Sequence, residues 1–218
     1  MPRAKQRTPE LRDRVLQVAV ATLATAGVAG FTTRKVAEHA QTSTPAVYEL
    51  FGDKAGLVRE VFFEGFRMLR ACLDQLTETD DPRADLIATI RALRTFIRQQ
   101  PALSEVMFSR PFADFDPGPS ELKAASAVRL FIVGRVRRCV DAGLLGGDET
   151  DIAHVLVSLT QGLAGTEIAG WLGTSKASVD RRWNLAIRAT LDGLGREAKP
   201  VPSRGHPRQR RRRAREDP

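Results

Sequence analysis

The chain has 218 residues, 42% hydrophobic and 28% charged, a composition that is typical of folded globular proteins and excludes global disorder. Its two cysteines, Cys72 and Cys139, stand in no CxxC or Cys/His pattern, so we expect neither a disulfide framework nor a metal site. Because no run of 18 wholly apolar residues occurs, the sequence predicts a cytoplasmic protein with no membrane partner.

The net charge of +8 is spread unevenly along the chain. Residues 200–218 carry seven arginines against Glu216 and Asp217, which gives this stretch +5 and leaves +3 for the rest. With almost no apolar residues, residues 199–218 cannot bury enough surface to offset their ordering entropy, and they are predicted to be a disordered basic tail. Such a tail suits a polyanionic partner, but it also serves solubility alone.

The first predicted helix spans about residues 9–26. Thr8 is placed to cap its first turn, Pro9 occupies the first helical position, and Gly27 follows the last apolar residue of the stripe. The apolar residues share one helical face: Leu11, Val15, Val18, Ala19, Leu23 and Ala26.

Two short helices with a tight turn between them are predicted over residues 32–51. Thr32 can cap a helix that runs to about Ala40, and Ser43 and Pro45 open a second one that ends at Gly52. This length and layout are those of a helix-turn-helix. The faces that would pack together hold Val36, Ala37 and Ala40 on the first helix and Val47, Leu50 and Phe51 on the second.

A long helix is predicted from Asp53 until residues 77–82 interrupt it. Since alternating strand-like runs are absent, the fold class is all-α, with a three-helix helix-turn-helix head before a larger helical body. The apolar face of the long helix is Leu57, Val58, Val61, Phe62, Gly65, Phe66, Leu69 and Leu73. The later helices are expected at about 82–99, 102–110, 120–142, 148–172 and 176–195.

The outward face of the helix-turn-helix offers mostly short polar side chains together with one tyrosine. Hydroxyl groups and free amides at helix N-termini can bind phosphate oxygens, and nearby basic residues add positive charge. The candidate DNA-binding residues are Thr33, Arg34, Lys35, Ser43, Thr44, Ala46, Tyr48 and Lys54. The alternative is a generic helical hairpin, in which Tyr48 and Phe51 are only core aromatics.

The segment GFTTRKVAEHAQTSTPAVYELFGDKAGLV, residues 30–58, resembles the N-terminal domain of the tetracycline-repressor (TetR) family of regulators, and the likeness runs over about residues 9–62. The matching positions are Gly30, Phe31, Thr32, Val36, Ala37, Ser43, Val47, Tyr48, Phe51 and Lys54. The resemblance implies that Thr33, Ser43, Thr44, Ala46, Tyr48 and Lys54 face DNA, while Phe31, Val36, Ala37, Val47 and Phe51 build the core of the head.

Two departures from the family pattern lie in this segment. Gln41-Thr42 replaces the usual Gly-Val of the turn, which costs strain if the backbone at residue 41 has a positive φ. Glu49-Leu50 replaces the His or basic residue that often precedes the aromatic position. Glu49 could accept a hydrogen bond from a cytosine amine or simply repel phosphate, which leaves base specificity open.

The resemblance also implies a DNA-binding domain over residues 1–56 and a ligand-binding and dimerisation domain over 57–198, and the basic tail over 199–218 follows them. The helices at 148–172 and 176–195 would form a four-helix seam in a homodimer, with ordinary intrachain packing as the alternative. The small and apolar residues of the first are Gly162, Ala164, Gly165, Ala169 and Gly170, with Val155, Leu159 and Leu163. Trp171 and Trp183 fit either the seam or the surface of the body.

A ligand pocket is likewise implied by the family, with candidate lining residues Phe62, Phe66, Phe96, Met107, Phe108, Phe131, His154 and Gln161. His154 and Gln161 are expected as satisfied core residues more often than as ligand contacts. No catalytic constellation, cofactor motif or metal site is evident, so we expect no enzyme.

The function that these observations predict is a homodimeric repressor that binds double-stranded DNA at a palindromic operator and is released by an unknown small-molecule effector. Two alternatives remain. One is a nonspecific DNA-binding protein driven by the Arg-rich tail, and the other is a helical small-molecule-binding protein without DNA binding.

Overall fold

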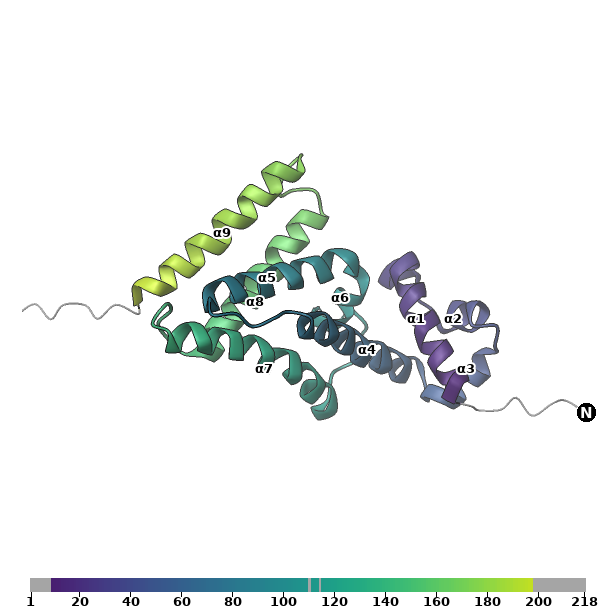
Figure 1. The fold of residues 1–218 in the computed structure, drawn as a ribbon. Helices are drawn as coiled ribbons and strands as arrows, with labels where there is room; N and C mark the ends of the chain where they lie inside the picture. Colours follow the sequence, from purple (N-terminus) through teal and green to yellow (C-terminus); the bar gives the residue numbers. More distant parts are fainter. Residues whose placement is uncertain (1–8, 110, 114, 198–218) are drawn as a thin grey trace, which may run out of the picture.

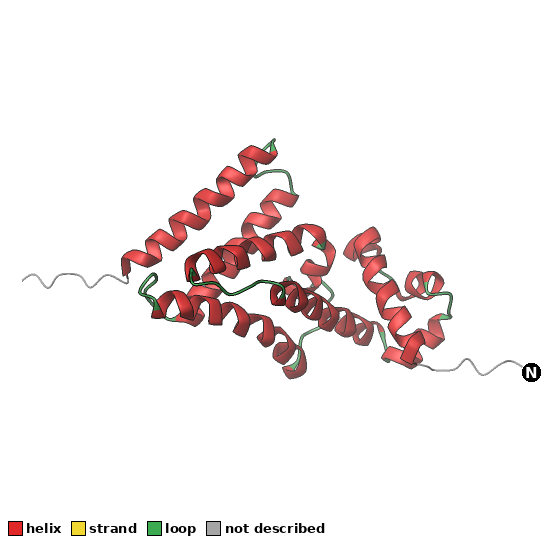
Figure 2. Ribbon diagram, viewed as in Figure 1, coloured by secondary structure: helices red, strands yellow, loops and turns green. Residues whose placement is uncertain are grey.

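A computed structural model describes residues 9–109, 111–113 and 115–197. Over these residues the chain forms nine α-helices and no strand, which confirms the predicted all-α class (Figure 2). Within the same ranges no helix combines the length and apolar character needed to cross a lipid bilayer. The predicted cap at Thr8 and the basic tail at 199–218 lie outside the described residues.

Three helices gather at one end of the molecule and form the head: α1 (Pro9–Gly30), α2 (Thr33–His39) and α3 (Thr44–Phe51) (Figure 1). α1 was expected to end at residue 26. Gly27 does leave the helical region, with φ 65° and ψ −179°, but the chain then makes one more turn to Gly30. Phe31 follows directly and is buried in the core.

Six helices form the body, and α4 belongs to both regions because it also packs against α1 and α3. α4, α5, α7 and α8 pack around one another, and α6 lies against both α1 and α4. α9 lies on the side away from the head (Figure 1). Their bounds are α4 (Lys54–Asp74), α5 (Pro82–Gln99), α6 (Pro101–Phe108), α7 (Pro119–Asp141), α8 (Glu149–Ile168) and α9 (Lys176–Glu197).

Proline and aspartate residues begin most helices of the body. α5, α6 and α7 each start at a proline, whose fixed φ suits the first helical position. Asp81 Oδ1 accepts a hydrogen bond from Ala84 N at 2.9 Å, and Asp148 Oδ1 accepts one from Thr150 N at 2.8 Å. These local signals explain why the predicted starts agree closely with the observed ones.

α8 ends earlier than predicted, at Ile168 rather than near residue 172. Gly170 adopts φ 77°, its N–H donates to Glu167 O at 3.0 Å, and Trp171 N donates to Thr166 O at 3.0 Å. This pair of bonds is a Schellman motif, which satisfies the last carbonyls of a helix and turns the chain away.

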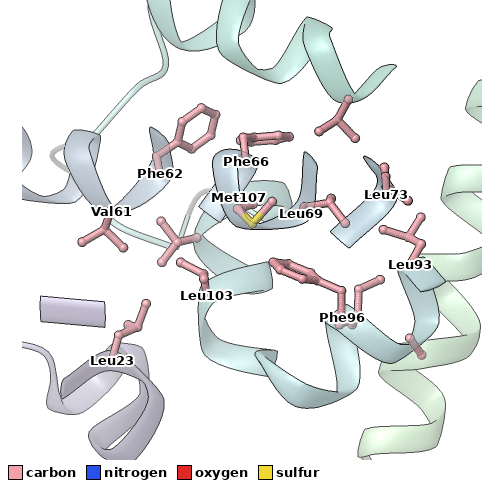
Figure 3. Close-up of a cluster of buried hydrophobic side chains, with 14 of the residues drawn as sticks. Leu23, Val61, Phe62, Phe66, Leu69, Leu73, Leu93, Phe96, Leu103 and Met107 are labelled. Atoms are coloured by element: carbon pink, nitrogen blue, oxygen red, sulfur yellow. The ribbon is translucent and has the colours of Figure 1, made fainter. Parts of the chain in front are cut away.

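The hydrophobic core is continuous from head to body. Leu23 of α1 lies near the α4 and α6 side chains, and Phe66, Met107 and Leu93 extend the cluster toward α5 (Figure 3). Every residue of the predicted apolar face of α4 is buried. The proposed domain boundary between residues 56 and 57 falls in the first turn of α4 and stays a prediction.

Candidate functional site

Side-chain caps and small residues fix the geometry of α2 and α3. Thr32 Oγ1 accepts from Lys35 N and Ser43 Oγ accepts from Ala46 N, each at 3.3 Å, so both helices start where predicted. The two helices pack closely through small and β-branched side chains. The buried contacts are Val36, Ala37, Ala40, Val47 and Phe51, with Phe31 beneath them.

The turn between α2 and α3 has the positive φ at residue 41 for which the sequence predicted backbone strain. Gln41 has φ 52°, the one positive φ of a non-glycine residue in the described part of the chain. Thr42 N donates to Ala37 O at 2.9 Å and Gln41 N to Glu38 O at 3.0 Å. The turn is therefore a Schellman motif like that at Gly170, with glutamine where glycine is preferred.

α1 holds the helix-turn-helix in place through side-chain contacts with α2, α3 and α4. The Arg12 guanidinium pairs with Glu60 of α4 at 2.8 Å and stacks over the Phe51 ring of α3 at 5.1 Å. Thr22 Oγ1 lies 3.2 Å from His39 Nδ1 at the end of α2. The head is thus a rigid support for the outward residues of α2 and α3.

The candidate DNA-binding residues differ in exposure. Arg34, Lys35, Ser43 and Tyr48 are exposed, and the Tyr48 side chain, at 43% exposure, extends from α3. Thr44, Ala46 and Lys54 are half-buried. Thr33 is only 6% exposed, which leaves its hydroxyl the least accessible of the set.

The loop between α6 and α7 joins the head to the body through aromatic rings. Phe112 lies 5.6 Å from Phe31 of the head, and the Lys54 ammonium stands 5.1 Å over the same Phe112 ring. Three residues later, Phe115 lies 5.6 Å from Phe62 of α4. The loop therefore contacts the helix-turn-helix with one ring and the interior of the body with the next.

A cavity of about 490 Å³ lies among α4, α5, α6, α7 and α8, a size common for small-molecule sites. Phe62, Phe66 and Met107 form part of its apolar wall, and Figure 3 shows Phe66 and Met107 close together in the same cluster. Its full lining is Phe62, Phe66, Leu69, Leu93, Met107, Phe108, Pro117, Leu122, Ala125, Ser126, Val128, Arg129, Ile132, Ala153, His154, Val157 and Gln161.

A buried carboxylate braces the loop where it enters α7. Glu121, 2% exposed, pairs with Arg59 of α4 at 2.6 Å, and its other oxygen accepts from Gly118 N and Ser120 Oγ, each at 2.9 Å. Burial disfavours its charge, but these hydrogen bonds and Arg59 outweigh burial and hold the pKa of Glu121 below its usual value. The wall of the cavity is therefore tied to α4 just after the head.

Two family models match the chain, and together they cover most of it. Residues 15–61 match the model of bacterial regulatory proteins of the tetR family, and residues 86–190 match that of the tetracyclin repressor-like C-terminal domain. The chain belongs to the TetR family. It is a transcriptional regulator with a DNA-binding helix-turn-helix and a ligand-binding C-terminal domain. A search of curated proteins found no match.

Solved structures of similar chains agree with this TetR fold. A protein of unknown function from Rhodococcus sp. RHA1 is 28% identical with a TM-score of 0.73, covering 88% of this chain and 99% of that one. A putative TetR-family regulator from Mesorhizobium loti MAFF303099 is 19% identical with a TM-score of 0.62, covering 87% and 98%. A TetR protein from Acinetobacter baumannii AYE, solved in complex with minocycline, is 18% identical with a TM-score of 0.61, covering 85% and 97%.

Six of the eight predicted pocket residues of this TetR-family chain line the cavity: Phe62, Phe66, Met107, Phe108, His154 and Gln161. Phe96 does not, because its ring is buried among the core side chains of α5 and α6 (Figure 3). Phe131 does not either, because it lies between the guanidinium groups of Arg70 and Arg135, at 5.1 and 5.0 Å. His154 is exposed, so the favoured interpretation as a core histidine was wrong.

None of the pocket residues predicted from the sequence lies on the face of α7 that lines the cavity. Leu122, Ser126, Arg129 and Ile132 recur at helical spacing along that face. The sequence shows this helical spacing, but it does not show which side of α7 faces the cavity, because that depends on how α7 packs against α4 and α8.

Proposed function

We propose that this chain is a homodimeric repressor whose two helix-turn-helix heads bind a palindromic operator, and whose affinity for that operator falls when a small-molecule effector enters the body. The observation that carries the proposal is the loop between α6 and α7, in which Phe112 contacts Lys54, next to the recognition helix, and Phe115 contacts Phe62 of the cavity lining. A ligand acts through such a link only if it prefers the conformation that does not bind DNA.

Exposure and chemistry favour α3 as the helix that enters the major groove. Ser43, Thr44, Ala46 and Tyr48 occupy its start, where recognition helices contact bases and phosphates. Arg34 and Lys35 are exposed at the start of α2 and Lys54 at least partly so at the start of α4, which suits phosphate contacts on either side. Thr33 stays in the proposed set through its backbone position at the N-terminus of α2.

An unpartnered face of α8 supports a homodimer. Val155, Ser158, Gly162, Gly165 and Ala169 are all exposed and recur at alternating spacings of three and four residues, the pattern of a helix–helix seam. A Cβ atom added at Gly162 or Gly165 would meet no atom within 4 Å, so a partner helix has room to approach. Ala164 points inward instead and is fully buried.

α9 contributes apolar surface next to this face. Leu185 is 60% exposed and Ile168 of α8 is 49% exposed, whereas Trp183 is buried and donates its Nε1–H to Glu167 at 2.7 Å. Trp183 therefore joins α9 to α8 within one chain, and Leu185 is left for a partner. We propose the four-helix seam of α8 and α9 with their copies as the dimer interface.

The experiment that tests the proposal is a gel-shift titration of the purified chain against the DNA that flanks its own coding region, with excess competitor DNA. We expect saturable retention of one palindromic fragment, because paired heads read two successive major grooves. Salt-sensitive retention of every fragment would instead identify the nonspecific, tail-driven binder.

The seam is tested separately by Gly165→Arg, which places a long charged side chain in the proposed contact. Sedimentation should show monomers, with the helix content unchanged because residue 165 faces open space. A matched substitution at exposed Thr174, in the loop before α9, should leave the dimer intact. A variant dimer as stable as that of the parent chain would move the interface elsewhere.

A further inference from the structure

The buried residues of the described cavity lining are all apolar, whereas Ser126 and Gln161 are half-buried and Leu122, Arg129 and His154 are exposed. Phe62, Phe66, Leu69 and Met107 are all buried and form an apolar interior. Arg129 and His154 are exposed, and they lie at the part of the lining that reaches the surface. A molecule that fits both parts must have an apolar body and a polar end.

The charge of the lining has one sign. Arg129 is its one charged residue among those described, and no aspartate or glutamate contributes to it. None of the ion pairs formed by the described residues involves Arg129, whereas its helix neighbours Arg135, Arg137 and Arg138 all pair with carboxylates. Arg129 is therefore a cation at a cavity mouth without a counter-ion from the described chain.

Two further polar groups stand near this cation in the lining. Ser126 precedes Arg129 by one turn of α7, and His154 faces the cavity from α8. His154 Nδ1 lies 2.8 Å from Thr150 O, and because a carbonyl only accepts, Nδ1 carries the proton of that bond. The Nε2 atom of His154 is then left for a ligand.

We propose that the effector is an apolar organic anion, such as an aromatic or aliphatic carboxylate or sulfonate, whose hydrocarbon body fills the space beside Phe62 and Phe66 and whose anionic group binds Arg129. The inference rests on the proposed effector function of this cavity. A cationic ligand would meet no carboxylate among the described lining residues, and a wholly neutral ligand would leave the guanidinium of Arg129 unpaired at the contact.

The test uses two fluorescent probes with the same aromatic skeleton, anilinonaphthalenesulfonate, which is an anion, and N-phenylnaphthylamine, which is neutral. Both are titrated into the full chain and into Arg129→Gln. We expect the substitution to weaken the anion about tenfold, because a charge-assisted contact is lost, and to leave the neutral probe unchanged. Because Arg129 is exposed, its substitution should leave the fold intact.

Two control variants locate the effect. Lys123→Gln removes a positive charge from an exposed position on the same helix that does not line the cavity, and it should not change either affinity. Ala125→Phe adds bulk to a half-buried lining position and should weaken both probes.

The outcomes separate this inference from the proposed function. If both probes bind in the cavity but Arg129→Gln affects them equally or not at all, the ligand class is wrong while the effector site stands. If Ala125→Phe leaves both probes unaffected, neither occupies the cavity, and the inference fails together with the proposed effector site. Operator binding is measured independently by gel shift and would be untouched by either result.

Discussion

The head and the body use their polar side chains in opposite ways. In the head, Ser43 and Asp53 cap the helices that follow them, and apart from the buried Thr33 the remaining polar residues of α2 and α3 are exposed or half-buried. In the body, Glu167 joins Arg94 of α5 at 2.8 Å and Trp183 of α9 at 2.7 Å in a partly buried network. Substitutions on the outer face of the head should therefore change binding, whereas substitutions in the networks of the body should change stability.

A second network in the body centres on Asp85 of α5. Its carboxylate accepts from Thr79 N at 2.9 Å and from the Thr79 hydroxyl at 2.8 Å, and it pairs with Arg138 of α7. Arg135, only 3% exposed, lies 3.7 Å from the same carboxylate and donates to Leu76 O at 2.9 Å. Asp85 thus anchors the α4–α5 connection to α7.

The largest effect expected from this contrast is that of Asp85→Ala. Loss of the carboxylate leaves the buried Arg135 guanidinium and Arg138 with only the exposed Glu78 as a shared counter-ion, and the free energy of unfolding should fall by about 3 kcal/mol. Urea denaturation followed by circular dichroism measures it. Asp74→Ala, which breaks the exposed pair with Arg70, is the matched control and should cost less than about 1 kcal/mol. Equal losses for the two variants would contradict the contrast.

Acid should weaken the body through the same carboxylate. The Thr79 N–H bond, with help from Arg138 and the Thr79 hydroxyl, outweighs burial and lowers the pKa of Asp85 from 3.8 to about 2. The unfolded chain therefore takes up this proton first, so the stabilisation is complete above about pH 4 and is lost as the pH falls toward 2. The urea midpoint should fall less steeply for Asp85→Asn than for the parent chain when the pH is lowered from about 5 to about 3, a range that spans the unfolded pKa. Parallel curves for the two proteins would rule this assignment out.

On the outer face of the head, Tyr48→Ala tests the opposite behaviour. We expect operator affinity to fall about tenfold while the melting temperature stays unchanged, because the side chain contributes contact with DNA rather than core packing. Gel shift and thermal unfolding of the same preparation measure both. Tyr48→Phe distinguishes the contribution of the hydroxyl from that of the ring. Unchanged operator affinity in Tyr48→Ala would show that Tyr48 is not a DNA-binding residue.

Between the two regions, Phe112→Ala should loosen the head without unfolding the body. It removes the ring contact with Phe31 and the cation–π contact with Lys54, each of about 1 kcal/mol, so amide exchange in α2 and the first turn of α4 should quicken about fivefold. Phe108→Ala deletes a ring that contacts Phe66 in the cavity wall and serves as the control. Equal exchange in the head for both variants would show that Phe112 has no special part in joining the regions.

The smallest effect should come from the Schellman turns at Gln41 and Gly170. Gln41→Gly in the head relieves a positive φ and should raise the unfolding free energy by about 0.5–1 kcal/mol, partly offset by the greater freedom of glycine when unfolded. Gly170→Gln in the body reverses the exchange, with no atom within 4 Å of the new Cβ, and should lower it by about 1 kcal/mol. Thermal melts of both variants give the comparison, and shifts of the same sign would refute the strain at Gln41.

What could be predicted from the sequence follows the range of the interactions. Thr32, Ser43 and Asp53 cap helices through hydrogen bonds to residues three positions later, so these helix starts could be predicted without any tertiary information. The TetR resemblance rested on this same local pattern, which explains why fold and family were both recovered.

The cavity was recovered only in part, because its shape depends on how helices are rotated against one another. Phe131 was favoured for its aromatic ring, yet α7 presents the next residue, Ile132, to the cavity and turns Phe131 toward Arg70. Arg129 was overlooked because a lone arginine on a helix usually faces solvent. The Asp85–Arg138 pair, 53 residues apart, has no local signal at all.

The two cysteines make the native chain suitable for site-specific labelling. Cys139 is buried, its thiol donates to Pro82 O at 3.2 Å, and burial raises its pKa to about 11, so it holds almost no reactive thiolate near neutral pH. Cys72 is exposed near the end of α4, the helix shared by head and body. A maleimide spin label should attach at this one position per protomer, and the label-to-label distance in a dimer would then report directly how the two α4 helices move when an effector or operator is added.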